Sequence, residues 1–207
     1  MGRKVNPIGF RLGKVAQYNA LWFAEKKEYK NFLCKDLLIR TYIDKYFCDA
    51  GVDEVVISRK AGLVIVAIYS SRPGVIIGKD GNELKKTSQV LSKMIENPIE
   101  FNIIEVKKVE TNASLIAKTI ARQLEKRGSS FRRVIKKAVQ NCLKAGGQGI
   151  KVLCSGRLSG AEIARVESSK GGKLPLSTLR INIDYALCEA KTIYGVIGVK
   201  VFVCLGS

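Results

Sequence analysis

Histidine is absent from the 207-residue sequence, so the side chain that most often serves as a general base near neutral pH is missing. Six cysteines are present, but no two are spaced as Cys-x-x-Cys, and the common zinc-site spacings are therefore absent. The six are Cys34, Cys48, Cys142, Cys154, Cys188 and Cys204. Because most of them lie in apolar segments, we expect reduced thiols in a hydrophobic core. We expect no catalytic residues, no metal site and no cofactor.

Long apolar runs are also absent. No stretch approaches the roughly 18 consecutive apolar residues that a membrane-spanning helix needs. The first ten residues, MGRKVNPIGF, lack the apolar core of a signal peptide. Gly2 hints at a myristoylation motif, but Asn6 stands where that motif has Ser or Thr. We therefore expect a protein that stays in the cytoplasm.

Acidic residues are scarce relative to basic ones. The chain has 36 Lys and Arg against 18 Asp and Glu, which gives a formal net charge of +18. Such an excess attracts polyanions and releases their counterions on binding. Nucleic acid is the expected partner, with an anionic membrane as the main rival. The length predicts one large domain or two of about 100 residues each.

The first half of the chain predicts a basic arm and lead-in over residues 1–35 and a compact unit over 36–109. Asp36 is placed to cap a helix whose apolar side carries Ile39, Ile43, Tyr46, Phe47 and Ala50. Two strands follow, then a short helix, a Gly-x-x-Gly turn, a second helix that Asn97-Pro98 ends, and a third strand. The expected ranges after the first helix are 52–59, 63–70, 75–77, 78–81, 82–95 and 99–109.

The second half, residues 110–207, predicts a two-layer α+β domain with a largely antiparallel sheet. The helix over 130–145 has the most regular spacing of apolar residues in the chain. Residues 159–172 have an ambiguous pattern, for which a helical turn followed by a strand is one interpretation. The other expected elements are a helix over 112–127 and strands over 149–158, 179–191 and 195–205.

The turn Gly78-Lys79-Asp80-Gly81 has a pattern that binds phosphate in single-stranded nucleic acids. Two glycines allow a sugar-phosphate backbone to come close, the following helix turns its free amides toward it, and Lys79 adds a cation. The alternative is a tight corner between helices that binds nothing, and Asp80 would repel phosphate. A nucleotide-binding P-loop is excluded, because only three residues separate Gly74 from Gly78 and Asp80 replaces the magnesium-binding Ser or Thr.

A basic stripe runs along the predicted helix 130–145. Arg132, Arg133, Lys136 and Lys137 lie opposite its apolar side, an arrangement suited to holding a strand by its phosphates without reading sequence. The alternative is an ordinary solvated helix face.

A third basic cluster surrounds the segment 168–173, which contains Lys170 and Lys173. Arg157, Arg165 and Arg180 lie near it in sequence. Such a glycine-rich segment fits an RNA groove or a flexible hairpin tip, and the pattern does not separate the two.

Six segments together resemble one known family. They are VNPIGFRLG, RPGVIIGKDG, FRRVIKKAVQN, GIKVLCSGRLSGAEIAR, LRINIDYA and TIYGVIGVKV. Their order and approximate spacing, from Met1 to about Gly206, are similar to those of the bacterial-type small-subunit ribosomal protein three family. The resemblance implies a type II KH domain (helix-strand-strand-helix-helix-strand) followed by the α+β domain characteristic of that family.

The resemblance also implies a location and a role. The family lies in the head of the small ribosomal subunit, held by ribosomal RNA and neighbouring proteins, and helps form the channel through which messenger RNA enters. Arg132, Arg133, Lys136 and Lys137 then face messenger RNA and assist the unwinding of structured messages. The residues implied to contact ribosomal RNA are Gly2, Arg3, Lys4, Arg11, Arg157, Arg165, Lys170, Lys173 and Arg180.

Two other function classes remain open from the sequence alone. A free KH-type regulator of transcription or RNA processing would need only the Gly78–Gly81 turn to bind RNA. A nucleic-acid lyase would need an activated lysine amine, and no carboxylate cluster accompanies one in the sequence. A bacterial source is favoured over an organellar one.

Overall fold

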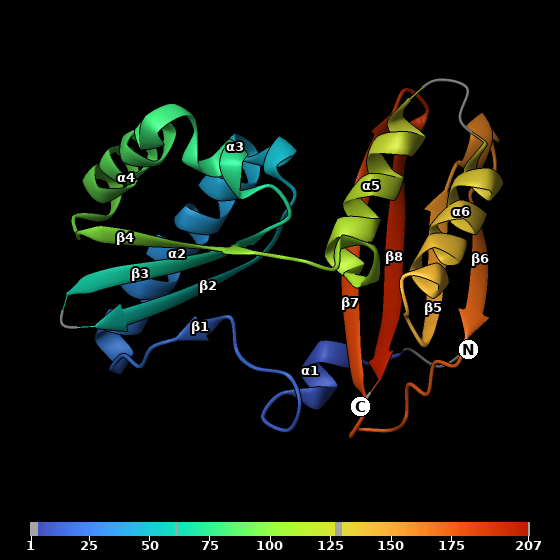
Figure 1. Ribbon diagram of the computed structural model, residues 1–207, viewed down its shortest axis with the longest axis horizontal. Helices are drawn as coiled ribbons and strands as arrows, with labels where there is room; N and C mark the ends of the chain where they lie inside the picture. Colours follow the sequence, from blue (N-terminus) through green and yellow to red (C-terminus); the bar gives the residue numbers. More distant parts are fainter. Residues whose placement is uncertain (1–3, 61, 127–129, 207) are drawn as a thin grey trace. The chain divides into compact units, whose positions relative to one another are not determined.

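The computed structural model describes residues 4–60, 62–126 and 130–206. These residues form two compact units (Figure 1). Residues 18–107 make up one, here called the KH unit, and residues up to 17 pack with those from 108 onward in the other, here called the C-terminal unit. The domain limits 36–109 and 110–207 stay a prediction, because packing into units does not test them.

The KH unit is a sheet with helices packed on one face. Strands β2 (Val52–Lys60) and β3 (Leu63–Ser70) are antiparallel, β4 (Ile99–Glu105) is parallel to β3, and the short β1 (Ala20–Leu21) is parallel to β2. The helices are α2 (Lys26–Tyr46), α3 (Pro73–Ile77) and α4 (Asn82–Ile95), with 3₁₀ turns at Cys48–Ala50 and Lys79–Gly81. The element order expected of a type II KH domain is confirmed.

Alternating side chains of the central strands explain this packing. Val64, Val66 and Ile68 of β3 are buried on one face, where they meet Ile43 of α2 and Leu91 of α4. A period of two along a strand and a period near 3.6 along a helix place all of these side chains in one core.

The start of the first long helix was predicted wrongly. Helix α2 begins at Lys26, and Asp36 is a buried residue in its middle rather than its cap. The Asp36 carboxylate pairs with the Arg59 guanidinium and accepts a hydrogen bond of 2.7 Å from Nε1 of Trp22. None of residues 26–35 is buried, so no strong apolar stripe marks this part of the helix in the sequence.

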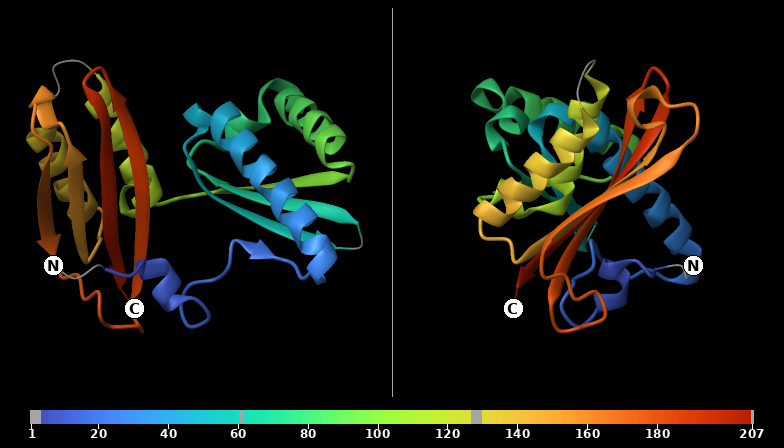
Figure 2. Two further views of the ribbon diagram at one scale, coloured as in Figure 1. Left: turned by 180° about the vertical axis from the view of Figure 1, so that it is seen from behind. Right: turned by 90° about the vertical axis from the view of Figure 1, so that its right-hand side faces the viewer.

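The C-terminal unit is a four-stranded antiparallel sheet in the order β6-β5-β8-β7, as the α+β prediction requires. Its strands are β5 (Gly149–Gly156), β6 (Arg165–Gly172), β7 (Asn182–Thr192) and β8 (Gly195–Gly206). Helices α5 (Ala113–Glu125) and α6 (Phe131–Lys144) cover one face of the sheet (Figure 2). Short 3₁₀ turns lie at Val109–Thr111 and Leu158–Gly160.

The segment 168–173, for which a flexible hairpin tip was one interpretation, lies almost wholly within a strand. Residues 165–172 form β6, which pairs with β5 along its whole length at the edge of the sheet. Glycine, serine and lysine have low strand propensity, so the strand depends on its pairing with the apolar β5 rather than on its own composition.

The cysteines mostly follow the prediction. Cys142, Cys154 and Cys204 are buried and Cys188 is half-buried, all as free thiols, whereas Cys34 and Cys48 are exposed. Burial raises the pKa of the Cys142 and Cys154 thiols to about 11, so both stay protonated and unreactive near neutral pH.

Arg11 fastens the N-terminal arm to the C-terminal unit. Helix α1 (Pro7–Arg11) is capped by Asn6, and the Arg11 side chain is 1% exposed. Its guanidinium donates hydrogen bonds to the carbonyl oxygens of Leu176, Thr178 and Ile181 at 2.9 Å each and to that of Pro7 at 3.1 Å. The expectation that Arg11 contacts ribosomal RNA is corrected, because its donors are used inside the protein.

Replacing Arg11 by methionine should loosen this arm. The carbonyl oxygens lose charge-assisted hydrogen bonds, which we expect to lower the free energy of unfolding by about 2–4 kcal/mol. Hydrogen–deuterium exchange of residues 7–16 should become faster in the variant. Lys14→Met, an exposed cation on the same arm, is the matched control and should leave exchange unchanged. Equal exchange in both variants would contradict an anchoring role.

Candidate nucleic-acid interface

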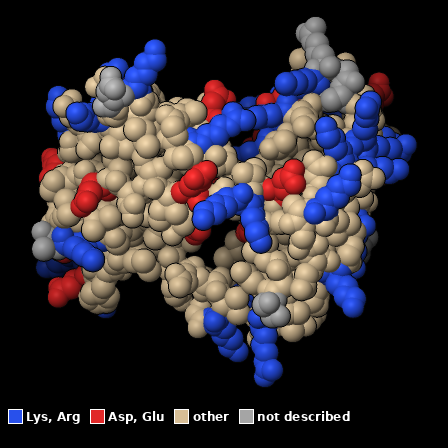
Figure 3. Space-filling model, in the orientation of Figure 1, with Lys and Arg blue, Asp and Glu red and all other residues tan. Residues whose placement is uncertain are grey.

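The orientation of α6 is fixed by its apolar side. Phe131, Val134, Ile135, Val139 and Cys142 are buried against the C-terminal sheet. Because the helix repeats every 3.6 residues, the basic side chains between them must face solvent. Lys and Arg side chains gather over this helical side of the C-terminal unit (Figure 3).

The predicted basic stripe forms one surface. Arg132, Arg133, Lys136 and Lys137 line a shallow groove of about 460 Å³ together with Ser130 and Gln140. We call these four side chains the α6 cations. Each is exposed, and together they present positive charge over more than one helical turn.

The α6 cations are not equivalent. Arg132 lies 3.3 Å from a carboxylate oxygen of Glu167 on β6, and its guanidinium stacks 5.5 Å from the centre of the Phe131 ring. Arg165 contacts the same ring at 5.7 Å. Among the described residues, Arg133, Lys136 and Lys137 have no ion pair, so their charge is available to a ligand.

The Gly78–Gly81 turn has the backbone geometry that glycine permits. Gly78 has φ 72° and ψ −174°, and Gly81 has φ 72° and ψ 12°, both strained for other residues. Gly81 precedes α4 and no side chain caps the helix there, while Lys79 is exposed. The side chain of Asp80 is outside what the structure describes.

A carboxylate of the protein lies at the start of the same helix. Glu83, in the first turn of α4, accepts hydrogen bonds from the Tyr46 hydroxyl at 2.7 Å and from Lys86 at 3.1 Å. These two bonds, and the charge of Lys86, lower the pKa of Glu83, so it is ionised near neutral pH. A bound phosphate would have to lie near this negative charge, which makes the turn a weaker anion site than the sequence indicated.

The remaining predicted RNA contacts are distributed over the C-terminal unit. Gly2 and Arg3 lie outside the described residues. Arg157 is half-buried and donates hydrogen bonds to the carbonyl oxygens of Ala161 at 2.9 Å and Tyr194 at 3.2 Å. The exposed members of the predicted set are Lys4, Arg165, Lys170, Lys173 and Arg180.

The structure adds residues to the candidate interface that the sequence did not identify. Lys14 of the arm lines a groove of about 650 Å³ with Arg180, although the two are far apart in the chain. Phe131 and Glu167 position Arg132, and only the fold brings Glu167 to α6. No sequence pattern marks Lys14 or Glu167 as part of an interface.

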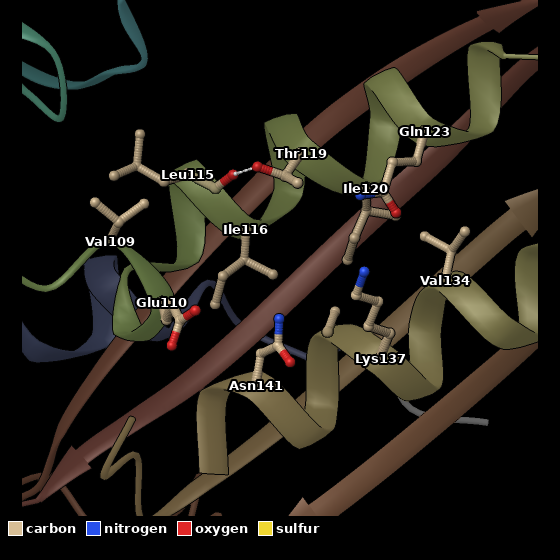
Figure 4. A pocket seen from close by; sticks show the side chains of 11 residues that line it. Val109, Glu110, Leu115, Ile116, Thr119, Ile120, Gln123, Val134, Lys137 and Asn141 are labelled. Atoms are coloured by element: carbon tan, nitrogen blue, oxygen red, sulfur yellow. Dashed lines mark hydrogen bonds between the residues drawn. The ribbon is translucent and has the colours of Figure 1, made fainter. Parts of the chain in front are cut away.

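A small hollow of about 240 Å³ separates α5 from α6 (Figure 4). Lys137 and Asn141 point into it from α6, opposite Ile116, Ile120 and Gln123 of α5. Its lining carries no pair of carboxylates and no activated nucleophile. In the part of the chain that the structure describes, no cluster of Cys, Asp and Glu is arranged to hold a metal ion, and no helix is long and apolar enough to cross a membrane.

Comparisons with known proteins agree with the KH and α+β organisation of the fold. Residues 38–111 match the family described as "KH domain", and residues 120–203 match "Ribosomal protein S3, C-terminal domain". The chain is 57% identical to small ribosomal subunit protein uS3 of Wolbachia sp. subsp. Brugia malayi, over 98% of each chain. It is also 57% identical to uS3 of Ehrlichia canis, over 100% of this chain and 97% of the relative. The uS3 of Anaplasma marginale is 54% identical over the same shares.

Substitution of the two turn glycines should have unequal effects. A Cβ on Gly78 would lie 2.6 Å from Cγ and 2.8 Å from Cβ of Glu83, whereas one on Gly81 would meet no atom within 4 Å. We expect Gly78→Ala to lower the stability of the KH unit by about 2–4 kcal/mol and Gly81→Asn by less than about 1 kcal/mol.

The fluorescence of Trp22, the single tryptophan of the chain, reports the unfolding of the KH unit, because Trp22 lies in that unit. Denaturant midpoints that shift equally for the two variants would contradict the steric role of Gly78.

Proposed function

The chain belongs to the family of small ribosomal subunit protein uS3, and we propose that it is an RNA-binding component of the bacterial small subunit whose α6 cations hold messenger RNA. The observation that carries this proposal is the groove lined by Arg132, Arg133, Lys136 and Lys137. We further propose that it lies in the subunit head, in the cytoplasm, beside ribosomal RNA and neighbouring ribosomal proteins.

The groove supports a ligand that is recognised by charge rather than by sequence. Its polar groups are mobile ammonium and guanidinium groups, which bind phosphate from many directions. No buried set of donors and acceptors is present in its lining to read the edges of bases. A messenger that must move through the site needs this kind of contact.

Such a surface assists unwinding without hydrolysing nucleotide. Cations that bind a separated strand lower its free energy relative to the paired strand, so base pairs that open are slower to close. Movement of the message is supplied by translation itself. The role of this chain is therefore to favour the single strand at the position where α6 meets it.

The α6 groove is a better candidate for the main RNA contact than the Gly78–Gly81 turn. Glu83 brings a negative charge to the turn, while Arg133 and Lys136 have no acidic partner among the described residues. The turn therefore supports the alternative, a free KH-type regulator, less well than the groove supports a ribosomal role.

The double variant Arg133→Ala with Lys136→Ala tests the proposal. With about 0.5 kcal/mol for each exposed charge contact, we expect translation through a stable messenger hairpin to slow about fivefold. Translation of an unstructured message should stay unchanged. Translation rates on matched messages, with and without the hairpin, measure the difference.

The charge-conserving double variant Arg133→Lys with Lys136→Arg is the control and should keep most of the wild-type rate. Variant ribosomes that pass hairpins at the wild-type rate would rule out this role for α6. A wild-type chain that remains at the top of a sucrose gradient, away from small subunits, would contradict the ribosomal role itself.

A further inference from the structure

A separate group of cations lies on the face of the C-terminal sheet that points away from α5 and α6, here called the far face. Ile150, Val152 and Cys154 of β5 are fully buried on the helical side. Since side chains alternate along a strand, Lys151 points to the far face. The register of β6 places Lys170 directly opposite Lys151.

The N-terminal arm adds a third lysine to this pair. Beyond the effect of partial burial, the charge of Lys4 lies close enough to Lys151 to lower the pKa of its ammonium group. This approach is supported by the anchoring of the arm, because Asn6 caps α1 two residues after Lys4 and Arg11 fixes the other end of that helix. Three segments that are distant in sequence therefore bring their ammonium groups together.

In the free protein this arrangement is unfavourable. Like charges that face each other across a β-sheet destabilise it. Partial burial first, and then the proximity of Lys4 and the charge of Lys170, lower the pKa of Lys151. None of the groups that shift this pKa is acidic.

Among the residues that the structure describes, the paired strands place no carboxylate next to Lys151 on the far face. Phe202 on β8 is the other neighbour of Lys151, and Tyr185 on β7 lies beyond it. Lys200 of β8 is paired with Leu153, the next residue of β5 after Lys151 that points to the far face. Glu189 is two cross-strand pairs away, and residues 4–17 of the arm contain no Asp or Glu.

We propose that Lys4, Lys151 and Lys170 together bind one phosphate group, and that this group belongs to an RNA backbone; the second part rests on the proposed ribosomal function. One anion placed among three cations turns their mutual repulsion into attraction. Lysine binds phosphate as a point charge and needs no fixed geometry, so side chains from an arm and two strands can converge on it.

This assignment makes two predictions of opposite sign. Lys151→Met removes the central charge, so the free protein should become more stable, while binding of phosphate becomes weaker. A solvated lysine with no ligand would produce neither effect.

The dependence of stability on pH should also show that the charge of Lys151 destabilises the free protein. Because folding lowers the pKa of Lys151, the unfolded chain binds more protons in the range between the lowered and the ordinary value. Raising the pH through that range should increase the free energy of unfolding of the wild type. The difference in this free energy between the wild type and Lys151→Met should therefore become smaller.

The first experiment compares thermal unfolding of the full chain in sodium phosphate and in sodium chloride at equal ionic strength. With phosphate at about tenfold excess over its Kd, the wild-type Tm should rise by about 3 °C above the chloride value. Lys151→Met and Lys170→Met should each lose this increment. Lys200→Met removes an exposed cation from the same face and should keep it.

The second experiment uses small-subunit ribosomal RNA as the probe. For Lys151→Met, the slope of log K against log salt concentration should fall by about one, and for Lys200→Met it should not change. A phosphate-specific Tm increment with an unchanged slope would overturn the assignment to an RNA backbone. No phosphate-specific increment in the wild type would overturn the site.

Failure of the site and failure of the proposed function can be told apart. A wild-type chain that sediments with small subunits but shows no phosphate-specific increment overturns only the three-lysine site. A chain that shows the increment yet does not sediment with subunits supports the phosphate site and contradicts its assignment to the ribosome.

Discussion

The burial of one side of α6 is the constraint on which the candidate interface depends. Phe131, Val134 and Ile135 pack on the sheet, and this leaves Arg132, Arg133, Lys136 and Lys137 no position except the surface. Moving an ammonium or guanidinium group into that core without a partner would cost several kcal/mol. The hydrophobic effect therefore determines where the positive charge of this helix lies, and the charge determines what the helix can bind.

The same sheet organises positive charge on both of its faces. Helix α6 presents cations on the helical side, and Lys151 and Lys170 present them on the far face. An uncompensated charge of +18 makes the free protein repel itself, and an RNA partner relieves that repulsion at many points at once. Membership of the uS3 family fits a chain whose positive surface charge is neutralised by bound RNA.

Local patterns predicted the elements that have a strong period. Helix α6 and strands β3, β5 and β8 were identified because their apolar residues repeat at helical or strand spacing. The α6 cations followed from the same pattern, since the polar side of a helix is defined by its apolar side. The resemblance to a ribosomal family added the role of these residues, and the comparisons confirmed the family.

Long-range contacts were beyond the reach of the sequence. The resemblance implies an RNA contact for Arg11, but the carbonyl partners of its side chain lie 165 to 170 residues away in the sequence, and only the folded chain brings them together. The sequence predicts a helix cap at Asp36, but its actual partners, Trp22 and Arg59, lie outside the helix and are brought to it only by the fold. Strand β6 has little strand propensity of its own. The proximity of Lys151 to Lys170 follows only from the register of β5 and β6, which the sequence does not reveal.

Photo-crosslinking from α6 in translating ribosomes tests the central claim most directly. A photoreactive residue would replace Lys136, which faces solvent in the α6 groove, and the RNA attached to the protein would be sequenced. We predict crosslinks to messenger RNA on the side that has yet to be translated, with many different messages represented. Crosslinks confined to ribosomal RNA would contradict the proposal that α6 holds messenger RNA.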